Sequence, residues 1–467
     1  MSSLAAHRGA YRRVLAIGLP LVVSMGATTL MLFTDRMFLG NYSLDAIAAA
    51  LPAGIAAFAI QSFFIGTAGY TGVFIAQYTG AQRPQRVGAA LWQGVWFCLL
   101  AGVLSAAASL LAGPLFALAG HPDDVRVLEE PYFRLLMLGG VFGVLDAAFS
   151  GFFTGRGLTR VVMAVNLTGA ILNIPLDYAL IYGAFGFPEL GIRGAALATV
   201  AGGAVSAVLF TALIFTRKNE RLFRVRSAWA LDRDLFMRLM KYGLPGGVQF
   251  FLDIFAITFF VFLVGRIGKE ELAATNIVFS INTLTFLPMV GFSVAASTLV
   301  GQALGAGDPD AAHRDTMATL KLTLGYMTAV ALLFVVFPET FLALFRPRDM
   351  NAAEYAAITA TGVWLMRFVA VYSIFDAVAM ILFGALKGAG DSRYLMLSMG
   401  SAAILVMIVP TYAAVESFGA GVYTAWAFLT AYVLALAGLM WLRYRGGKWR
   451  RMRVIEGAAG ASASDAP

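Results

Sequence analysis

The sequence has little charge and few of the residues from which most active sites are built. Of its 467 residues only 13% are charged, three are histidine and one, Cys98, is cysteine. One cysteine excludes an intrachain disulfide, and the histidines show no metal-ligand spacing. No G-x-x-x-x-G-K-[ST] motif occurs, which leaves an ATP-driven mechanism without support. The sequence therefore predicts neither an enzyme nor a bound cofactor.

Apolar residues, in contrast, are abundant. They make up 60% of the chain, more than a soluble protein of this length can bury. The net charge of +8 would suggest nucleic acid in a soluble protein. Here Lys and Arg gather in the loops of one membrane side, so we expect a lipid bilayer and no nucleic-acid partner. The first apolar run, ending near Leu39, is too long for a signal-peptide core and is interpreted as the first span.

Twelve apolar segments are long enough to cross a bilayer. They lie at about 14–39, 46–72, 88–118, 132–154, 161–184, 194–216, 237–264, 273–300, 316–344, 356–384, 394–415 and 420–443. The sequence therefore predicts an all-α integral membrane protein of twelve transmembrane helices in two six-helix bundles. Its predicted regions are a cytoplasmic N-terminus (1–13), a first bundle (14–216), a cytoplasmic linker (217–236), a second bundle (237–443) and a basic, then disordered tail (444–467).

The distribution of basic residues predicts the orientation. With both termini inside, 25 of the 34 Lys and Arg residues fall on the inner side and eight on the outer side. Cytoplasmic loops carry this excess in membrane proteins. We therefore expect a multi-pass protein of the inner (plasma) membrane with both termini in the cytoplasm.

Residues 18–81 and 243–306 repeat one another about 225 positions apart. The matching positions include Gly18-Leu19-Pro20 with Gly243-Leu244-Pro245, Gly66 with Gly291, Gln77 with Gln302, Gly80-Ala81 with Gly305-Ala306, and Pro84 with Pro309. A second pair of turns, 155–160 and 388–393, repeats about 233 apart. Duplicated bundles are the architecture of many secondary transporters, which place a substrate site between repeats.

Five aspartates lie within predicted spans: Asp35, Asp146, Asp177, Asp253 and Asp376. Each costs about 2.5–3.5 kcal/mol at a helix centre, so most are expected to be functional. Four-residue spacing places polar partners on the same helix face, as in Asn173/Asp177, Gln249/Asp253 and Tyr372/Asp376. Such groups can hold a proton or offer oxygens to Na+. Asp146 has no such partner, and its role stays open.

Three further residues within spans have competing interpretations. Arg36 adjoins Asp35, but neighbouring helical residues diverge by about 100°, so it is expected to anchor the interface. Arg367 is expected to be a counter-ion or to reach the membrane surface. Pro20 and its repeat partner Pro245 bend their helices, either as fixed kinks or as moving hinges.

From about residue 10 to 445 the chain resembles the MATE (multidrug and toxic compound extrusion) transporters, and it is closest in pattern to the NorM-like branch. The specific passages are GLPLVVSMGATTLMLFTDRMFLG, LNIPLDYALIYGAFGFPELGIRGAALATV, GLPGGVQFFLD and VYSIFDAVAMILFGALKGAGDSR. The resemblance implies a two-lobed bundle that exports organic cations and amphipathic drugs in exchange for Na+ or H+. It implies no catalytic residue and no metal beyond a possible Na+ at Asp253, Tyr372 and Asp376.

The resemblance also assigns roles to single residues. Asp35 matches the family's first-helix aspartate, and Asn173 and Asp177 match its partner pair. Asp376 and Tyr372 match the acid and tyrosine of a cation site on the tenth helix, and Pro20 matches the proline of a helix proposed to bend. Asp253 stands where the NorM-like branch usually has Glu, one methylene longer. This departure, and the added charge of Arg36, leave the coupling ion open.

Together these features predict a cation-coupled antiporter for small amphipathic or cationic compounds, acting as a monomer without cofactors. One alternative is a lipid-linked oligosaccharide flippase of the same superfamily. Its cavity should favour basic residues for a pyrophosphate, whereas these spans hold five aspartates and, near their middles, essentially Arg367 alone among bases. A membrane-embedded enzyme is a less favoured alternative, because nothing in the sequence resembles a metal or nucleophile arrangement.

Overall fold

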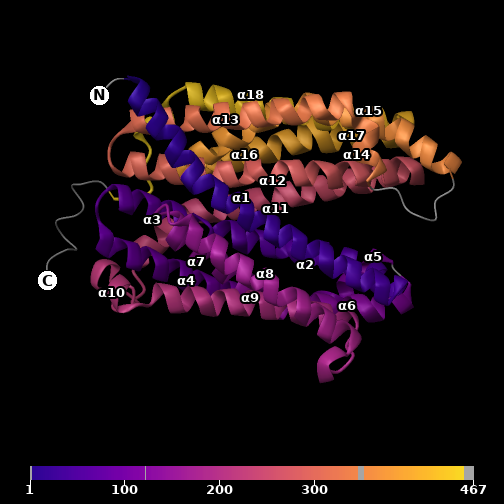
Figure 1. Ribbon diagram of the computed structural model, residues 1–467, viewed down its shortest axis with the longest axis horizontal. Helices are drawn as coiled ribbons and strands as arrows, with labels where there is room; N and C mark the ends of the chain where they lie inside the picture. The colour runs from indigo at the N-terminus through magenta and orange to yellow at the C-terminus, as the bar shows by residue number, and fades with distance from the viewer. Residues whose placement is uncertain (1–2, 121, 345–351, 457–467) are drawn as a thin grey trace. The chain divides into compact units, whose positions relative to one another are not determined.

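The computed structural model describes residues 3–120, 122–344 and 352–456, which are helical and contain no strand (Figure 1). The first repeat and the linker form α1 (Ser3–Tyr42), α2 (Leu44–Ala68), α3 (Tyr70–Gly80), α4 (Pro84–Ala108), η1 (Ser109–Leu111), α5 (Ala112–Ala119), α6 (Asp123–Leu138), α7 (Gly140–Thr154), α8 (Thr159–Tyr182), η2 (Ala184–Gly186), α9 (Ile192–Ile214) and α10 (Arg217–Phe223). The second repeat forms α11 (Arg233–Ile267), α12 (Lys269–Gly305), α13 (Pro309–Val336), α14 (Pro338–Ala343), α15 (Ala352–Ala389), α16 (Ser392–Ala402), η3 (Ala403–Ile408), α17 (Val409–Phe418), α18 (Val422–Arg445) and η4 (Lys448–Arg451).

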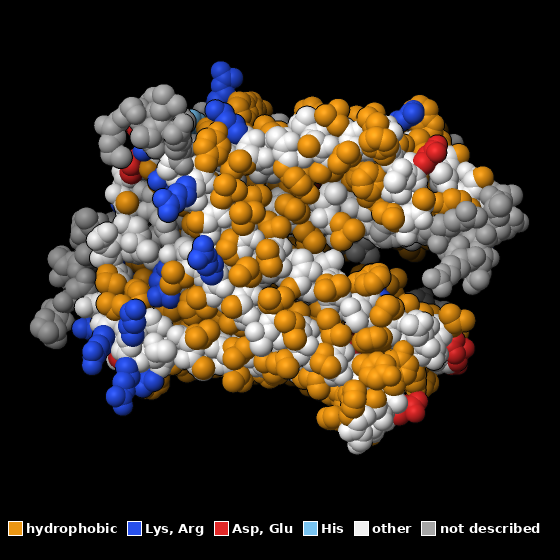
Figure 2. Space-filling view, in the orientation of Figure 1, with side chains coloured by type: hydrophobic (Ala, Val, Ile, Leu, Met, Phe, Trp, Pro, Cys, Tyr) orange, Lys and Arg blue, Asp and Glu red, His pale blue; other side chains and the backbone are white. Residues whose placement is uncertain are grey.

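Twelve helical stretches in the described ranges are long and apolar enough to cross a membrane, which confirms the predicted number. The helices extend beyond the predicted apolar segments, as in the tenth stretch, Tyr355–Ala389. Figure 2 shows hydrophobic side chains along the middle of the helices, with Lys and Arg gathered near α3 and α10. Each long helix thus presents an apolar girdle of bilayer length.

The helices divide into two compact units. Of the described residues, those within 1–22, 252–300 and 308–452 form unit 1, and those within 23–251, 301–307 and 453–467 form unit 2. Within unit 1, α15 packs against α13 and α18, while in unit 2 α8 packs against α9 and α2 against α6 (Figure 1). The core of unit 1 includes Phe260 and Trp426, whose Nε1 donates to Thr275 Oγ1 at 3.1 Å.

Unit boundaries fall inside α1 and α11, which the sequence assigned whole to separate bundles, and also near the end of α12, whose residues 301–305 belong to unit 2. The first part of α1, up to Val22, belongs to unit 1 with most helices of the second repeat. The first part of α11, up to Phe251, belongs to unit 2 with the helices of the first repeat. Each repeat therefore contributes the first part of its first helix to the unit built mainly by the other.

Repeated glycines allow the close contacts of these exchanged segments. In unit 2, a Cβ on Gly66 of α2 would lie 2.9 Å from the carbonyl oxygen of Gly246 on α11. In unit 1, a Cβ on Gly291 of α12 would lie 3.1 Å from the backbone nitrogen of Val22 on α1. Gly66 and Gly291 are repeat partners, and only glycine permits so close a helix approach. The duplicated glycines are thus explained by the exchanged helices.

A second symmetric contact joins the ends of α3 and α12 within unit 2. A Cβ on Gly80 would overlap the carbonyl oxygen of Gln302, and one on Gly305 would overlap that of Gln77. The side chains of the two glutamines bind other backbone groups. Gln302 Nε2 donates to Gly155 O at 2.8 Å, and Gln77 Oε1 accepts from Val454 N at 2.8 Å.

The prolines leave most helices unbroken. Pro20, Pro175, Pro245 and Pro288 lie inside α1, α8, α11 and α12, respectively. Pro410 follows the π-helical η3, where the hydrogen-bond ladder already departs from α geometry. The expected bending of α1 at Pro20 stays a prediction, although the division between the units falls two residues after this proline.

The end of the described chain differs from the predicted disordered tail. Val454 and Ile455 are only 2% and 7% exposed, and Glu456 makes several polar contacts. Alanine, glycine and serine dominate the sequence beyond Ile455, a composition that gives no sign that Val454 and Ile455 are buried. Residues 457–467 lie outside the described part of the chain.

Candidate functional site

In unit 2, three predicted site residues come together on two helices. Asp35 lies on the second part of α1, and Asn173 and Asp177 lie one turn apart on α8. Asn173 and Asp177 are fully buried and Asp35 is 7% exposed. Asp35 and Asp177 are close enough to interact electrostatically. The four-residue spacing on α8 therefore points both of its polar groups at one acidic site.

Hydrogen bonds on either side of the acids hold α1 against α8. Asn166 Nδ2 donates to Ser24 Oγ at 2.9 Å, and Tyr182 Oη donates to Phe38 O at 2.7 Å. Phe38 also packs edge-on against the ring of Tyr182, with 6.2 Å between ring centres. Because these contacts bracket the site, they fix the separation of the two carboxylates.

The polar atoms of this site are buried without protein partners. Within the described part of the chain, five side-chain atoms of this site have no hydrogen-bond partner. They are Oδ1 and Oδ2 of Asp177, Oδ1 and Nδ2 of Asn173, and Oδ1 of Asp35. Buried polar groups of this kind carry a large desolvation cost unless something binds them. Two neighbouring carboxylates without internal donors suit a proton or a cation.

In unit 1, Asp253, Tyr372 and Asp376 form a second acidic site. Asp253 lies on the second part of α11, and Tyr372 and Asp376 lie one turn apart on α15. The two carboxylates are half-buried and interact electrostatically, and Tyr372 is 4% exposed. This arrangement offers two carboxylates and a phenol to a single positive charge.

Each acidic site includes a tyrosine that the sequence interpretation missed. Tyr132 of α6 is 6% exposed and lies within electrostatic range of both Asp35 and Asp177. Tyr432 of α18 is 4% exposed and stands in the same relation to Asp253 and Asp376. The acids of each site lie on other helices than its tyrosine, so spacing along α6 or α18 does not connect Tyr132 or Tyr432 with them.

The remaining predicted residues, Gln249, Asp146, Arg36 and Arg367, are not among the residues that form the two acidic sites. Gln249 is 8% exposed, one turn before Asp253 on α11, but in the part of that helix assigned to unit 2. Asp146 on α7 is half-buried. Arg36 is exposed, as is Arg367, whose guanidinium lies 4.3 Å from the ring centre of Trp364. The exposure of both arginines agrees with positions at the surface of their helices.

Comparisons with known proteins identify the family. The MatE family profile matches residues 20–179 and again 245–413, one match for each repeat. A protein named "Probable multidrug resistance protein NorM" from Thermotoga maritima is 27% identical over 450 residues, covering 95% of this chain and 94% of that protein. "Multidrug resistance protein PmpM" from Pseudomonas aeruginosa is 28% identical over 395 residues, covering 84% and 81%.

Solved structures show the same fold. A structure described as the outward-facing conformation of a multidrug resistance MATE family transporter superposes with a TM-score of 0.85 at 19% identity, covering 97% of this chain and 99% of that one. The eukaryotic MATE transporter AtDTX14 gives a TM-score of 0.84 at 17% identity, covering 95% and 97%. With twelve candidate spans and a profile match over both repeats, the chain is a multi-pass membrane transporter, not an enzyme, and belongs to the MATE family.

Proposed function

We propose that this protein is a secondary active antiporter that exports amphipathic, often cationic organic compounds in exchange for Na+ or H+. It acts as a monomer in the inner membrane, with both termini in the cytoplasm. The names of its relatives, multidrug resistance proteins, support the class of substrate. The predicted inner side carries most of the Lys and Arg, which supports the orientation.

The observation that carries the proposal is the site of Asp35, Asn173 and Asp177. Its polar atoms are buried without partners in the described part of the chain, and two of its members are acids. A proton or a positively charged compound relieves the repulsion between the acids and supplies the missing hydrogen bonds. The site therefore favours positive ligands and rejects anions.

The second acidic site, in unit 1, supports the coupling of substrate export to entry of an ion. Asp253, Asp376 and their two tyrosines differ from the first site in having half-buried acids and no amide partner from α15. One site holds the substrate or a proton while the other holds the coupling ion. Each ion entering is driven by about 2.3 kcal/mol per 100 mV of membrane potential. One or two ions suffice for a substantial substrate gradient.

Alternating access requires the two units to move as bodies, and α1 and α11 pass from one unit to the other. Pro20 lies two residues before the crossing in α1, where the missing backbone donor weakens the helix. This position supports Pro20 as a hinge.

The direct test measures export of ethidium from inverted membrane vesicles, driven in turn by an imposed Na+ gradient and an imposed pH gradient. We expect one gradient to drive export, and Asp35→Asn or Asp376→Asn to reduce it about tenfold or more, because each removes a charged partner. Asp45→Asn removes an exposed acid at the start of α2 and is the matched control.

Phenylalanine variants refine the test. Tyr132→Phe and Tyr432→Phe each remove one hydroxyl beside two acids and should slow export about three- to tenfold. Tyr423→Phe, at an exposed position on α18, should leave export unchanged. Full export by the Asp35 and Asp376 variants under both gradients would refute the assignment of the sites.

The flippase alternative receives no support from the described residues. It needs cations around a pyrophosphate, yet Arg367, a basic residue that the sequence placed near the middle of a span, is exposed beside Trp364. Transport of a lipid-linked saccharide that survives Arg367→Gln, with no ethidium export by the unmodified protein, would favour that alternative.

A further inference from the structure

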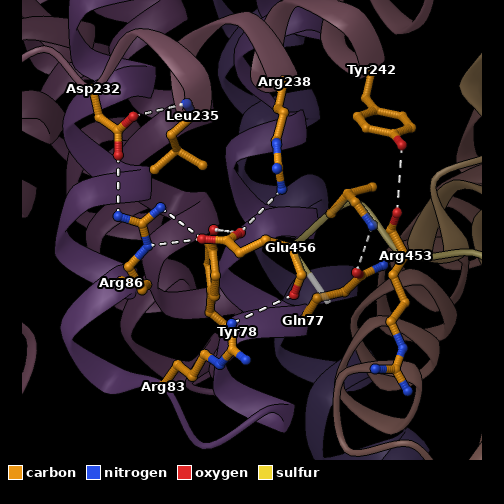
Figure 3. Close-up of polar contacts among 11 residues, drawn as sticks. Gln77, Tyr78, Arg83, Arg86, Asp232, Leu235, Arg238, Tyr242, Arg453 and Glu456 are labelled. Carbon is orange, nitrogen blue, oxygen red and sulfur yellow. Dashed lines mark hydrogen bonds and ion pairs between the residues drawn. The ribbon is translucent and has the colours of Figure 1, made fainter. Parts of the chain in front are cut away.

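The last described residues of the chain lie in a basic site of unit 2, beside α3, α4 and α11 (Figure 3). Val454 and Ile455 are buried, and the Glu456 side chain is only 13% exposed. More than two hundred residues separate Glu456 from each of its side-chain partners in the sequence. Nothing in the transport proposal uses this arrangement.

The Glu456 carboxylate receives hydrogen bonds from three side chains on three helices. Tyr78 Oη donates to Oε2 at 2.6 Å, and Arg238 Nη1 donates to Oε2 at 3.3 Å. Arg86 donates to Oε1 from Nε at 3.1 Å and from Nη2 at 2.7 Å. Charged, two-pronged contacts of this kind are among the strongest hydrogen bonds in proteins. They join α3, α4 and α11 through one carboxylate.

The site also binds the main chain of the segment. Gln77 Oε1 accepts from Val454 N at 2.8 Å, and Tyr242 Oη donates to Arg453 O at 3.5 Å. Figure 3 shows these contacts beside those of Glu456. Since backbone and carboxylate are bound together, the site recognises both the main chain of residues 453–454 and the acid at position 456.

The charges of the site explain why an added acid is needed. Arg86 and Arg238 both point at Glu456, and Asp232 Oδ2, 3.1 Å from Arg86 Nη1, is another acid in contact with Arg86. Burial opposes ionisation of Glu456, but the hydrogen bond from Tyr78 and the Arg86 charge lower its pKa below the ordinary value. The carboxylate is therefore ionised at neutral pH.

Comparison of the two repeats shows that Glu456 takes the place of an acid that unit 1 has on a neighbouring helix. Arg238 of α11 is the repeat partner of Arg13 of α1, and in unit 1 Arg13 Nη2 lies 2.6 Å from Asp315 Oδ1 on α13. The repeat partner of Asp315 on α4 is Ala90, so α4 offers Arg238 no acid at this position. The C-terminal segment brings Glu456 in its place.

We propose that Gln77, Tyr78, Arg86 and Arg238 form a carboxylate-binding site whose ligand is the chain's own segment 453–456. This ligand fixes the first part of α11 to α3 and α4, as Asp315 fixes the first part of α1 to α13. The C-terminal segment is thus part of the architecture of unit 2, and its release frees the first turns of α11.

Hydrogen–deuterium exchange on the purified full-length protein tests this without any transport measurement. In Glu456→Gln we expect amides of residues 233–245 to exchange roughly tenfold faster than in the unmodified protein, since a charge-assisted bond is lost. Asp234→Asn is the matched control: it removes an exposed acid from the same first turn and should change exchange little. Glu456→Asp, which keeps the charge, should lie between the two.

A second variant separates the proposed contact from general damage. Arg238→Gln should accelerate exchange in the same residues, and the double variant Arg238→Gln/Glu456→Gln should be no faster than Glu456→Gln alone. Arg238→Gln also serves if Glu456→Gln folds too poorly to measure. Exchange in residues 233–245 that matches the Asp234→Asn control, or effects of the two variants that simply add, would overturn the proposal.

Discussion

The two units hold their exchanged helix segments by arginines at matching positions of the repeat, but the acids that pair with these arginines come from different parts of the chain. In unit 1, Arg13 of α1 pairs with Asp315, an acid from the neighbouring α13. In unit 2, Arg238 of α11 pairs with Glu456, an acid that arrives from the end of the chain. The glycine contacts beside these pairs, in contrast, are the same in both units. The close backbone contacts at glycine are therefore the same in both repeats. The acids that pair with Arg13 and Arg238, in contrast, differ between the repeats.

The same contrast applies to the acidic sites. Asp35 has Phe260 at its repeat position, and Asp253 has Thr28. Each unit nevertheless assembles two acids and a tyrosine from a third helix, using different positions of the repeat. Similar chemistry has therefore been placed twice on one scaffold, rather than inherited through the duplication.

The largest expected effect comes from disrupting the two matching contacts between α3 and α12, Gly80 with Gln302 and Gly305 with Gln77. Gly80→Val and Gly305→Val each force a side chain into a backbone carbonyl, and each should destabilise the protein by about 3 kcal/mol or more. Folded yield and thermal unfolding in detergent measure this. Gly438→Val, where a Cβ meets no atom within 4 Å, is the control. If only one of the two glycine variants were tolerated, the two contacts would be alike in geometry but unequal in their contribution to stability.

A smaller difference, in unfolding free energy, is expected between variants of the two repeated turns, 155–160 and 388–393. In unit 1, Arg443 makes two hydrogen bonds to the buried Asp391, at 2.6 and 3.1 Å. In unit 2, the guanidinium of Arg156 lies 3.9 Å from the centre of the Phe152 ring and 4.6 Å from that of Phe223, and burial lowers its pKa to about 10.

Because loss of Arg443 leaves a buried carboxylate without this partner, Arg443→Gln should cost about 2 kcal/mol of unfolding free energy. Arg156→Gln should cost about 1 kcal/mol or less, since only ring contacts and one hydrogen bond to Phe152 O are lost. Chemical denaturation of the two variants gives the comparison. The reverse order would mean that the aromatic contact, not the ion pair, is the stronger support of its turn.

The smallest effect concerns pH. The pKa of Glu456 is lowered from its ordinary 4.5 in the folded protein, so its ionised form stabilises that state. This contribution is fully present above about pH 5 and is lost as pH falls through the lower, folded pKa. The difference in melting temperature between the unmodified protein and Glu456→Gln should be constant from pH 7 to 5 and should shrink below about pH 4. A difference that grows on acidification would contradict the assignment.

Much of the fold could be predicted because its signals are local. Spanning helices follow from apolar runs, and the two bundles follow from the fixed offset that joins Gly66 to Gly291 and Gln77 to Gln302. Asn173/Asp177 and Tyr372/Asp376 could be paired because helical spacing alone places them on one face.

The features that escaped prediction depend on contacts between distant segments. The site acids near Tyr132 and Tyr432 lie on other helices, so the spacing of residues along the tyrosines' own helices does not reveal them. Glu456 follows a short apolar pair and precedes mostly alanine, glycine and serine, a composition typical of a tail. The exchange of helix segments leaves no mark on hydropathy, because each half of α1 is equally apolar.

The position of Glu456 also bears on how the protein is made. Unit 1 needs the first part of α1, and unit 2 needs residues 453–456, which the ribosome adds only after all the helices from α1 to α18. All helices of the first repeat can enter the bilayer long before that segment exists. Unit 2 is therefore expected to reach its final packing only after α18 has been made, and a chain interrupted before Arg453 leaves Arg86 and Arg238 without Glu456. Synthesis of this short segment, rather than insertion of any one helix, would then complete unit 2.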